Sequence, residues 1–77
     1  MDQINKHVSQ HYGRTIVVDN VEFKIDRDYL EKYHSTMAPQ TIEGKRWHYV
    51  SHVYGGQGYH AQLLMDDDGS LRVFYYG

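Results

Sequence analysis

The sequence predicts an α+β domain in which two short helices pack against an antiparallel sheet of about five strands. Two segments repeat apolar residues every three or four positions, as amphipathic helices do. An N-terminal segment and the last 32 residues alternate apolar and polar side chains instead, which is typical of half-buried strands. Seventy-seven residues suffice for one domain, so we expect residues 1–77 to fold as a single unit.

The first helix is predicted over residues 2–12. Asp2 can cap its N-terminus, and Gly13 follows it at the position where a left-handed residue commonly ends a helix. Residues four apart place three apolar side chains in one stripe along the helix: Ile4, Val8 and Tyr12.

Residues 14–25 are predicted to form a β-hairpin. Asp19 and Asn20 can adopt the positive φ angles of a two-residue turn, which sets Val18 opposite Val21. Because side chains alternate along a strand, one face of this hairpin is then apolar throughout. It carries Ile16, Val18, Val21, Phe23 and Ile25.

The second helix is predicted over residues 26–37, with Asp26 as its N-cap. Leu30 begins an apolar face with the spacing of a helix, continued by Tyr33, His34 and Met37. Pro39 ends the helix, because the residue before a proline is pushed out of the helical region. We expect residues 38–45 to form a loop.

The C-terminal part is predicted to be a three-strand meander, with strands at about 46–54, 59–66 and 70–76. Asp67-Asp68-Gly69 fits the second turn, a three-residue loop with glycine at the position that needs a positive φ. This turn sets Leu63 opposite Val73, with Ala61 and Met65 on the same inward face.

The register of the first turn of the meander is open, because Gly55-Gly56-Gln57-Gly58 permits a loop of odd or even length. An odd loop turns four residues toward the core, namely Trp47, Tyr49, Ser51 and Val53, and leaves four outside, namely His48, Val50, His52 and Tyr54. An even loop reverses the two sets. We favour the odd loop because Trp47 and Tyr49 are the larger apolar side chains.

The outward face of the meander is the candidate binding surface. An exposed apolar and aromatic patch usually marks an interface, and interface centres favour aromatic residues and arginine over lysine and glutamate. We therefore expect this face to bind another protein through His48, His52, Tyr54, His60, Leu64, Arg72, Phe74 and Tyr76. If a helix instead covers this face, the same side chains form a second small core.

Two other partners fit the same face. Aromatic sheets can stack the bases of single-stranded nucleic acid, although such binding normally uses a positive groove. The chain has 8 Lys and Arg against 10 Asp and Glu, a net charge of −2, so nucleic acid is the weaker prediction. A symmetric homodimer is the other alternative, because two copies of one apolar patch can bury each other.

The sequence indicates neither an enzyme nor a metal or cofactor site. His7 and His11 have the spacing of two ligands on a helix, but spacing fixes no third ligand near them. The run Asp66-Asp67-Asp68-Gly69 lacks the alternating ligands of a calcium loop. No nucleophile elbow or triad signature is present.

Composition favours a cytoplasmic protein. There are 0 Cys, which fits a reducing compartment, and no apolar run approaches the ~20 residues that cross a bilayer. The N-terminal sequence Met-Asp-Gln-Ile-Asn-Lys has no apolar signal core. Eight Tyr in a chain of this size suit a small regulator, inhibitor or accessory subunit, such as the compact inhibitors that phages and mobile elements encode.

Overall fold

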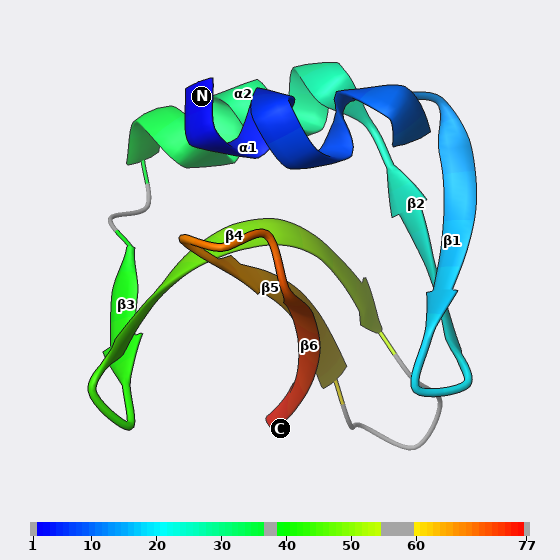
Figure 1. Ribbon diagram of the computed structural model, residues 1–77. Helices are drawn as coiled ribbons and strands as arrows, with labels where there is room; N and C mark the ends of the chain where they lie inside the picture. Colours follow the sequence, from blue (N-terminus) through cyan, green and yellow to red (C-terminus); the bar gives the residue numbers. More distant parts are fainter. Residues whose placement is uncertain (1, 37–38, 55–59, 77) are drawn as a thin grey trace.

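The computed structural model describes residues 2–36, 39–54 and 60–76 (Figure 1). These residues form two short helices and two antiparallel sheets, which confirms the α+β class. The expected sheet of about five strands is divided differently. One sheet has two strands in the order β1-β2, and the other has four in the order β3-β4-β5-β6.

The first helix, α1 (Asp2–Val8), continues into a 3₁₀ turn at Ser9–His11, so the predicted helix ends in a tighter final turn. Gly13 has a φ of 77°, as expected for the residue that ends the helical segment. Its backbone N–H donates to the carbonyl oxygen of Ile25 at 2.8 Å. This bond fixes the end of the helical segment beside the end of the first hairpin.

The first hairpin has the predicted register. β1 (Arg14–Val18) and β2 (Val21–Ile25) pair with Val18 opposite Val21, and the two turn residues have φ angles of 52° and 65°. These positive values belong to the two-residue turn that Asp19-Asn20 predicts. Both Phe23 and Ile25 are fully buried.

The second helix, α2 (Arg27–Thr36), begins where its cap predicts. Oδ1 of Asp26 accepts a hydrogen bond of 3.0 Å from the backbone N–H of Tyr29, the third helical residue. Leu30 is 1 % exposed, so its side of the helix faces the core.

The loop predicted at 38–45 is wrong in part. β3 (Gln40–Ile42) pairs with the start of β4 (Lys45–Tyr54) through a two-residue turn, Glu43-Gly44. Both turn residues have positive φ angles, 54° and 78°, which suit a tight hairpin. Glutamate is a less common turn residue than asparagine or aspartate, so the pattern did not indicate this hairpin.

The second turn of the meander has the predicted register. β5 (His60–Asp66) and β6 (Leu71–Tyr76) pair with Leu63 opposite Val73, and Gly69 has the expected positive φ of 90°. Three side chains on this side of β5 are buried at 1 % exposure or less: Ala61, Leu63 and Met65.

The first turn of the meander has the predicted odd length, but β4 changes register part-way along. Tyr54 lies opposite His60, and the intervening residues 55–59 lie outside the described residues. Tyr49 pairs with Leu64, whereas Ser51 pairs with Leu63, so Val50 is an extra residue in β4. This is a β-bulge, which reverses the alternation of side chains on its two sides.

The bulge makes the predicted orientation wrong at the start of β4. Ser51 and Val53 share a face with Leu63 and Ala61, as predicted. Before the bulge, Trp47 and Tyr49 share the opposite face with Asp66 and Leu64, and His48 points inward beside Met65. We call the two faces the Val73 face (His48, Ser51, Val53, Ala61, Leu63, Met65, Leu71, Val73 and Tyr75) and the Phe74 face (Trp47, Tyr49, His52, His60, Gln62, Leu64, Asp66, Arg72 and Phe74).

The helices and the first hairpin pack on the side of the Val73 face. In Figure 1, β4 forms an arch, and both helices lie together on its outer side. Oγ of Ser51, on the Val73 face, donates to the carbonyl oxygen of Lys24 in β2 at 2.8 Å. The main core joins this face to side chains from both helices and β2: Ile4, Val8, Phe23, Ile25 and Leu30.

Contact between α1 and the β5–β6 turn predicts unequal costs for two glycine substitutions. Gly44→Ala and Gly69→Ala each force an L-residue into a left-handed backbone, which costs about 1–2 kcal/mol. A Cβ at Gly44 meets open space, whereas one at Gly69 overlaps the ring of His7. Urea unfolding is therefore expected to show the larger loss for Gly69→Ala.

The background variant His7→Ala separates the two causes. In that background Gly69→Ala is expected to lose only about as much stability as Gly44→Ala, because the overlapping ring is gone. Equal losses for the two glycine variants in the unaltered protein would contradict the packing of α1 against this turn.

Candidate functional site

Three half-buried side chains form a continuous row across the Phe74 face. His52 in β4 lies opposite Gln62 in β5, and Gln62 lies opposite Phe74 in β6. Side chains directly opposite one another in antiparallel strands are about 4.5–5.5 Å apart at Cβ. The row therefore crosses three neighbouring strands without a break.

Two tyrosines of α2 extend this row beyond β4. The ring of Tyr29 lies 5.5 Å from that of His52, and the ring of Tyr33 lies 6.0 Å from it. The two tyrosine rings are themselves 4.7 Å apart, with their hydroxyl oxygens at 3.0 Å. Tyr29 is 42 % exposed, so this end of the row is open to solvent.

At the other end, Phe74 is held between a cation and a buried ring. The guanidinium carbon of Arg72 lies 5.0 Å from the centre of the Phe74 ring, and Trp47 meets the same ring edge-on at 5.3 Å. Arg72 is exposed and also forms an ion pair of 3.6 Å with Glu43. We call the surface formed by Tyr29, His52, Gln62, Phe74 and Arg72 the aromatic stripe.

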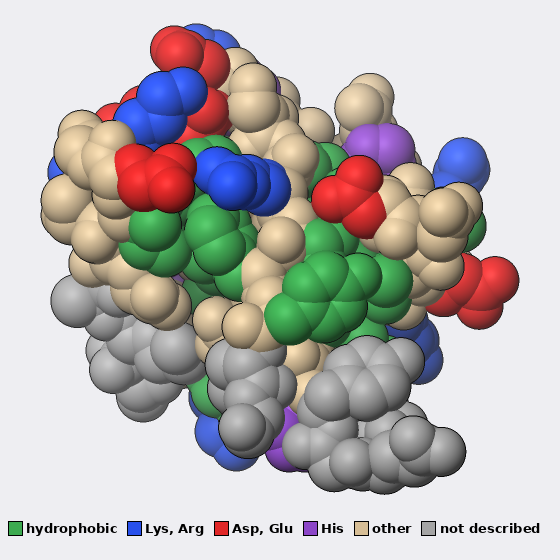
Figure 2. All heavy atoms as spheres, turned by 90° about the horizontal axis from the view of Figure 1, so that it is seen from below, with side chains coloured by type: hydrophobic (Ala, Val, Ile, Leu, Met, Phe, Trp, Pro, Cys, Tyr) green, Lys and Arg blue, Asp and Glu red, His purple; other side chains and the backbone are tan. Residues whose placement is uncertain are grey.

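Figure 2 shows the molecule from below, on the side away from the helices. Hydrophobic side chains gather across the middle of this view, and charged side chains lie around them, most densely at the upper left. Beneath the stripe, Leu64 and Trp47 are 1 % and 5 % exposed. The Phe74 face therefore buries some of its side chains in a small core and leaves the side chains of the aromatic stripe accessible to solvent.

The residues predicted to bind a partner differ in their exposure to solvent. Arg72 is exposed, and His52, His60 and Phe74 are half-buried. Leu64 is buried and offers no surface to a partner. Tyr54 and Tyr76 belong to β4 and β6, but their side chains lie outside the described residues.

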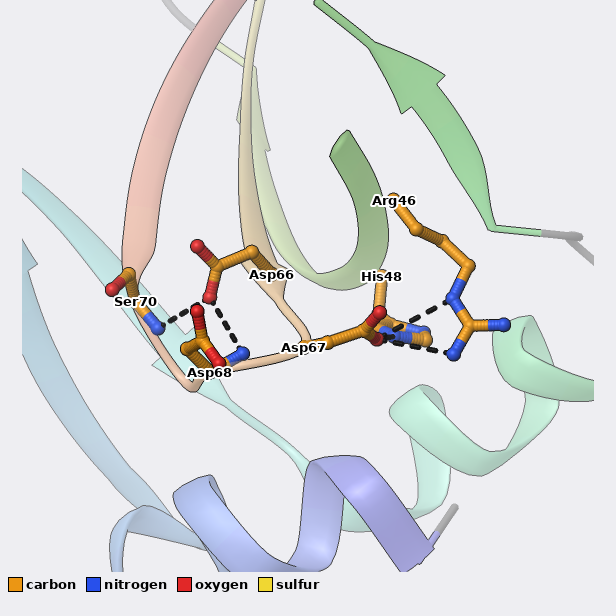
Figure 3. Close-up of polar contacts among 6 residues, drawn as sticks. All are labelled: Arg46, His48, Asp66, Asp67, Asp68 and Ser70. Carbon is orange, nitrogen blue, oxygen red and sulfur yellow. Dashed lines mark hydrogen bonds and ion pairs between the residues drawn. The ribbon is translucent and has the colours of Figure 1, made fainter. Parts of the chain in front are cut away.

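His48 is not on the surface where the sequence predicted it, because the bulge turns it toward the helices. It is 7 % exposed, and its Nε2 lies 2.7 Å from Oδ1 of Asp67. Arg46 approaches the same oxygen at 3.2 Å, so one carboxylate holds two side chains of β4 (Figure 3). The hydrogen bond from His48, and then that from Arg46, hold the pKa of Asp67 below its ordinary value of 3.8.

Tyr29 was missed by the sequence analysis, which followed the apolar face of the helix from Leu30. The available signal was its spacing, because residues i and i+4 of a helix lie side by side and Tyr33 is four residues later. Sequence alone gave no reason to place that pair beside His52.

The acidic run after β5 forms a turn held together by one of its own carboxylates. Oδ1 of Asp66 accepts hydrogen bonds from the backbone N–H groups of Asp68 (3.0 Å) and Ser70 (2.9 Å), as Figure 3 shows. Its Oδ2 lies 3.7 Å from Nζ of Lys45.

Two open hollows of about 230 and 350 Å³ flank the ion pair between Lys45 and Asp66. Over residues 2–36, 39–54 and 60–76, no group of three His, Asp or Glu side chains could hold a metal ion.

Comparison of the chain with protein-family models, with curated proteins and with solved structures found no match. Neither helix of the described part of the chain has the length and apolar character needed to cross a bilayer.

Two histidines, His52 of the aromatic stripe and His34 of α2, predict a loss of stability in acid. Burial, the largest cause, and then the charge on His60 lower the pKa of His52 below 6.5, and burial likewise lowers the pKa of His34. The unfolded chain then binds these protons more readily than the folded protein, so the free energy of unfolding falls as the pH drops below about 6.5.

Urea unfolding at pH 8, 6.5 and 5.5 measures this effect. The loss between pH 8 and 5.5 is expected to be smaller in His52→Gln, which removes one of the groups that titrate. A protein that becomes more stable as the pH falls over this range would contradict the direction of both pKa shifts.

The shared carboxylate predicts that Asp67→Ala destabilises the protein more than Asp68→Ala. The first variant removes the acceptor that holds Arg46 and buried His48. The hydrogen bond of Asp68 that Figure 3 shows uses its backbone N–H, which the second variant keeps. Thermal unfolding at pH 7 gives the two midpoints. Asp67→Ala is also expected to lose the part of the acid transition that lies below pH 3.8. Equal midpoints would show that the carboxylate does not hold β4.

Proposed function

We propose that the protein is a non-enzymatic module that binds another protein through the aromatic stripe. The observation that carries the proposal is the unbroken row from Tyr29 through His52 and Gln62 to Phe74, which joins one helix to three strands. Aromatic side chains with a neighbouring arginine are the residues that most often dominate binding energy in protein interfaces.

The side chains of the stripe are held in place before any partner arrives. Arg72 lies over Phe74, Phe74 lies against Trp47, and Tyr29 lies against His52. Ordering a free side chain at an interface costs about 0.5–1.5 kcal/mol, so groups already fixed by their neighbours lose less on binding. These contacts support the proposal that the stripe is a contact surface already formed in the free protein.

Charge favours a protein partner over a nucleic acid. Two cations that strand alternation places on the Phe74 face each have an acidic partner: Lys45 pairs with Asp66, and Arg72 pairs with Glu43. Nucleic-acid binding draws much of its affinity from cations that neutralise phosphates. Here those cations would first have to leave their carboxylates.

A small regulator, inhibitor or accessory subunit in the cytoplasm is the finer form of this proposal. The support is compositional: 8 Tyr in 77 residues suit a protein-binding surface, and 0 Cys suit a reducing compartment. A phage or mobile-element origin fits the same size and tyrosine content.

The proposal predicts which positions contact a partner. A photoreactive benzoylphenylalanine at Phe74 is expected to cross-link a partner from a lysate of the source cells, and the same group at Val17 is not. Val17 is the matched control, since it is an apolar strand residue with 62 % exposure in β1. Affinity for the purified partner is then expected to fall about 10–100-fold in Phe74→Ser and Tyr29→Ser, the range of interface hot spots, and to stay unchanged in Val17→Ser.

Circular dichroism and urea unfolding of the same variants show whether each is folded at the binding temperature. Unchanged affinity in folded Phe74→Ser and Tyr29→Ser would refute the stripe as the contact surface. Binding of a single-stranded oligonucleotide that weakens linearly with the logarithm of salt concentration would favour the nucleic-acid alternative instead.

A further inference from the structure

The edge strand β6 offers a second surface, separate from the side chains of the stripe. The sheet order β3-β4-β5-β6 places β6 at one edge with six residues, whereas β3 at the other edge has three. β1 approaches β6 but belongs to the two-stranded sheet. In the described part of the chain, no strand pairs with the outer side of β6.

The turn fixes which backbone groups of β6 point outward. The backbone N–H of Asp66 donates to the carbonyl oxygen of Ser70 at 3.0 Å, so these two residues form a hydrogen-bonded pair. Hydrogen-bonded and non-hydrogen-bonded pairs alternate along antiparallel strands. Leu71, Val73 and Tyr75 therefore occupy non-hydrogen-bonded positions with respect to β5, and their N–H and C=O groups point toward the open side.

The side chains of β6 favour pairing with another strand. The sequence Leu-Arg-Val-Phe-Tyr-Tyr has no proline or lysine, the residues that natural proteins use to guard an edge, and Arg72 is its one charge. Its aromatic and β-branched residues are strong strand formers. Tyr75 is 61 % exposed, although it lies on the same face as buried Val73.

We propose that β6 pairs antiparallel with β6 of a second copy of this chain, about a two-fold axis at Val73. Val73 then lies opposite Val73 of the second copy, and the two residues exchange both of their backbone hydrogen bonds. Leu71 lies opposite Tyr75 of the second copy. Arg72 lies opposite Phe74 of the second copy.

Charge and geometry select this register over its neighbours. It is the two-fold register that brings all three outward-pointing residues opposite one another. Moving the axis to Arg72 would set two arginines directly opposite, which is unfavourable in a sheet. Moving the axis to Phe74 would set Leu71 opposite position 77 of the second copy, which lies beyond the end of β6, so Leu71 would have no strand partner. With the axis at Val73, each Arg72 can contact a second Phe74 ring, the same kind of contact that it makes within its own chain.

The dimer goes beyond the proposed partner binding and does not depend on it. Two four-stranded sheets would join into one continuous sheet, and the two Phe74 faces would lie next to each other across the axis. A partner would then meet two aromatic stripes side by side.

Cysteine cross-linking tests both the dimer and its register, because the chain contains 0 Cys. Opposite residues at a non-hydrogen-bonded pair have Cα atoms about 4.5 Å apart, within the range of a disulfide. The variants Arg72→Cys and Phe74→Cys, mixed and oxidised with a glutathione buffer, are expected to form a disulfide-linked heterodimer. Each variant alone is the matched control and is expected to remain largely uncross-linked.

The pattern of products decides between registers. Cross-linking of Arg72→Cys with itself, or of Phe74→Cys with itself, at or above the level of the mixture would overturn the axis at Val73. No cross-linking in any of the three samples, together with a mass of 9.1 kDa by light scattering up to about millimolar concentration, would overturn the dimer.

A backbone change tests the role of the edge without altering a side chain. In chemically synthesised protein, N-methylation of Val73 removes its outward N–H and adds bulk at the open edge. The dimer dissociation constant, measured by sedimentation equilibrium, is expected to rise at least tenfold over that of the unmodified synthetic chain. Circular dichroism should be unchanged, because pairing with β5 does not use that N–H. An unchanged dissociation constant in the folded N-methyl protein would refute pairing through β6.

Discussion

The extra residue in β4 is the constraint on which the surface of this protein depends. Val50 has no partner position in β5, so the side chains before it face opposite to the positions that simple alternation would give them. As a result, Trp47 supports Phe74 from beneath, and His48 is buried beside the helices. Without the bulge, the two side chains would exchange faces, and the stripe would lose the ring on which Phe74 rests.

The bulge also explains how one sheet can serve two purposes. Bulges bend a strand and increase its twist, and β4 arches across the molecule in Figure 1. The Val73 face meets the helices and hairpin with apolar side chains such as Leu63 and Met65, which are fully buried. The Phe74 face buries Leu64 and Trp47 at its base and leaves His52, Gln62 and Phe74 partly accessible.

Elements governed by local chemistry were predictable from the sequence. The Asp19-Asn20 turn, the Asp26 cap and the Gly69 turn each depend on a few adjacent residues, and the structure has all three.

β3 was missed because Glu43-Gly44 is a weaker turn signal. The bulge at Val50 was missed because no local residue demands it: an apolar residue suits either face, and the register is decided by the packing of Trp47 and His48. The contact of Tyr29 with His52 depends in turn on how α2 packs against β4. His52, Arg72 and Phe74 were identified from alternation, whereas His48 and Leu64 were assigned to a surface that the folded chain does not give them.

The bulge can be observed directly by NMR in solution. Nuclear Overhauser effects between the indole of Trp47 and the ring of Phe74, together with effects between His48 and the β-protons of Asp67, are the result that the account predicts. Contacts from Trp47 to Leu63 and Val73 instead, with His48 in contact with Phe74, would show a β4 strand without the bulge. That result would contradict the arrangement of both faces.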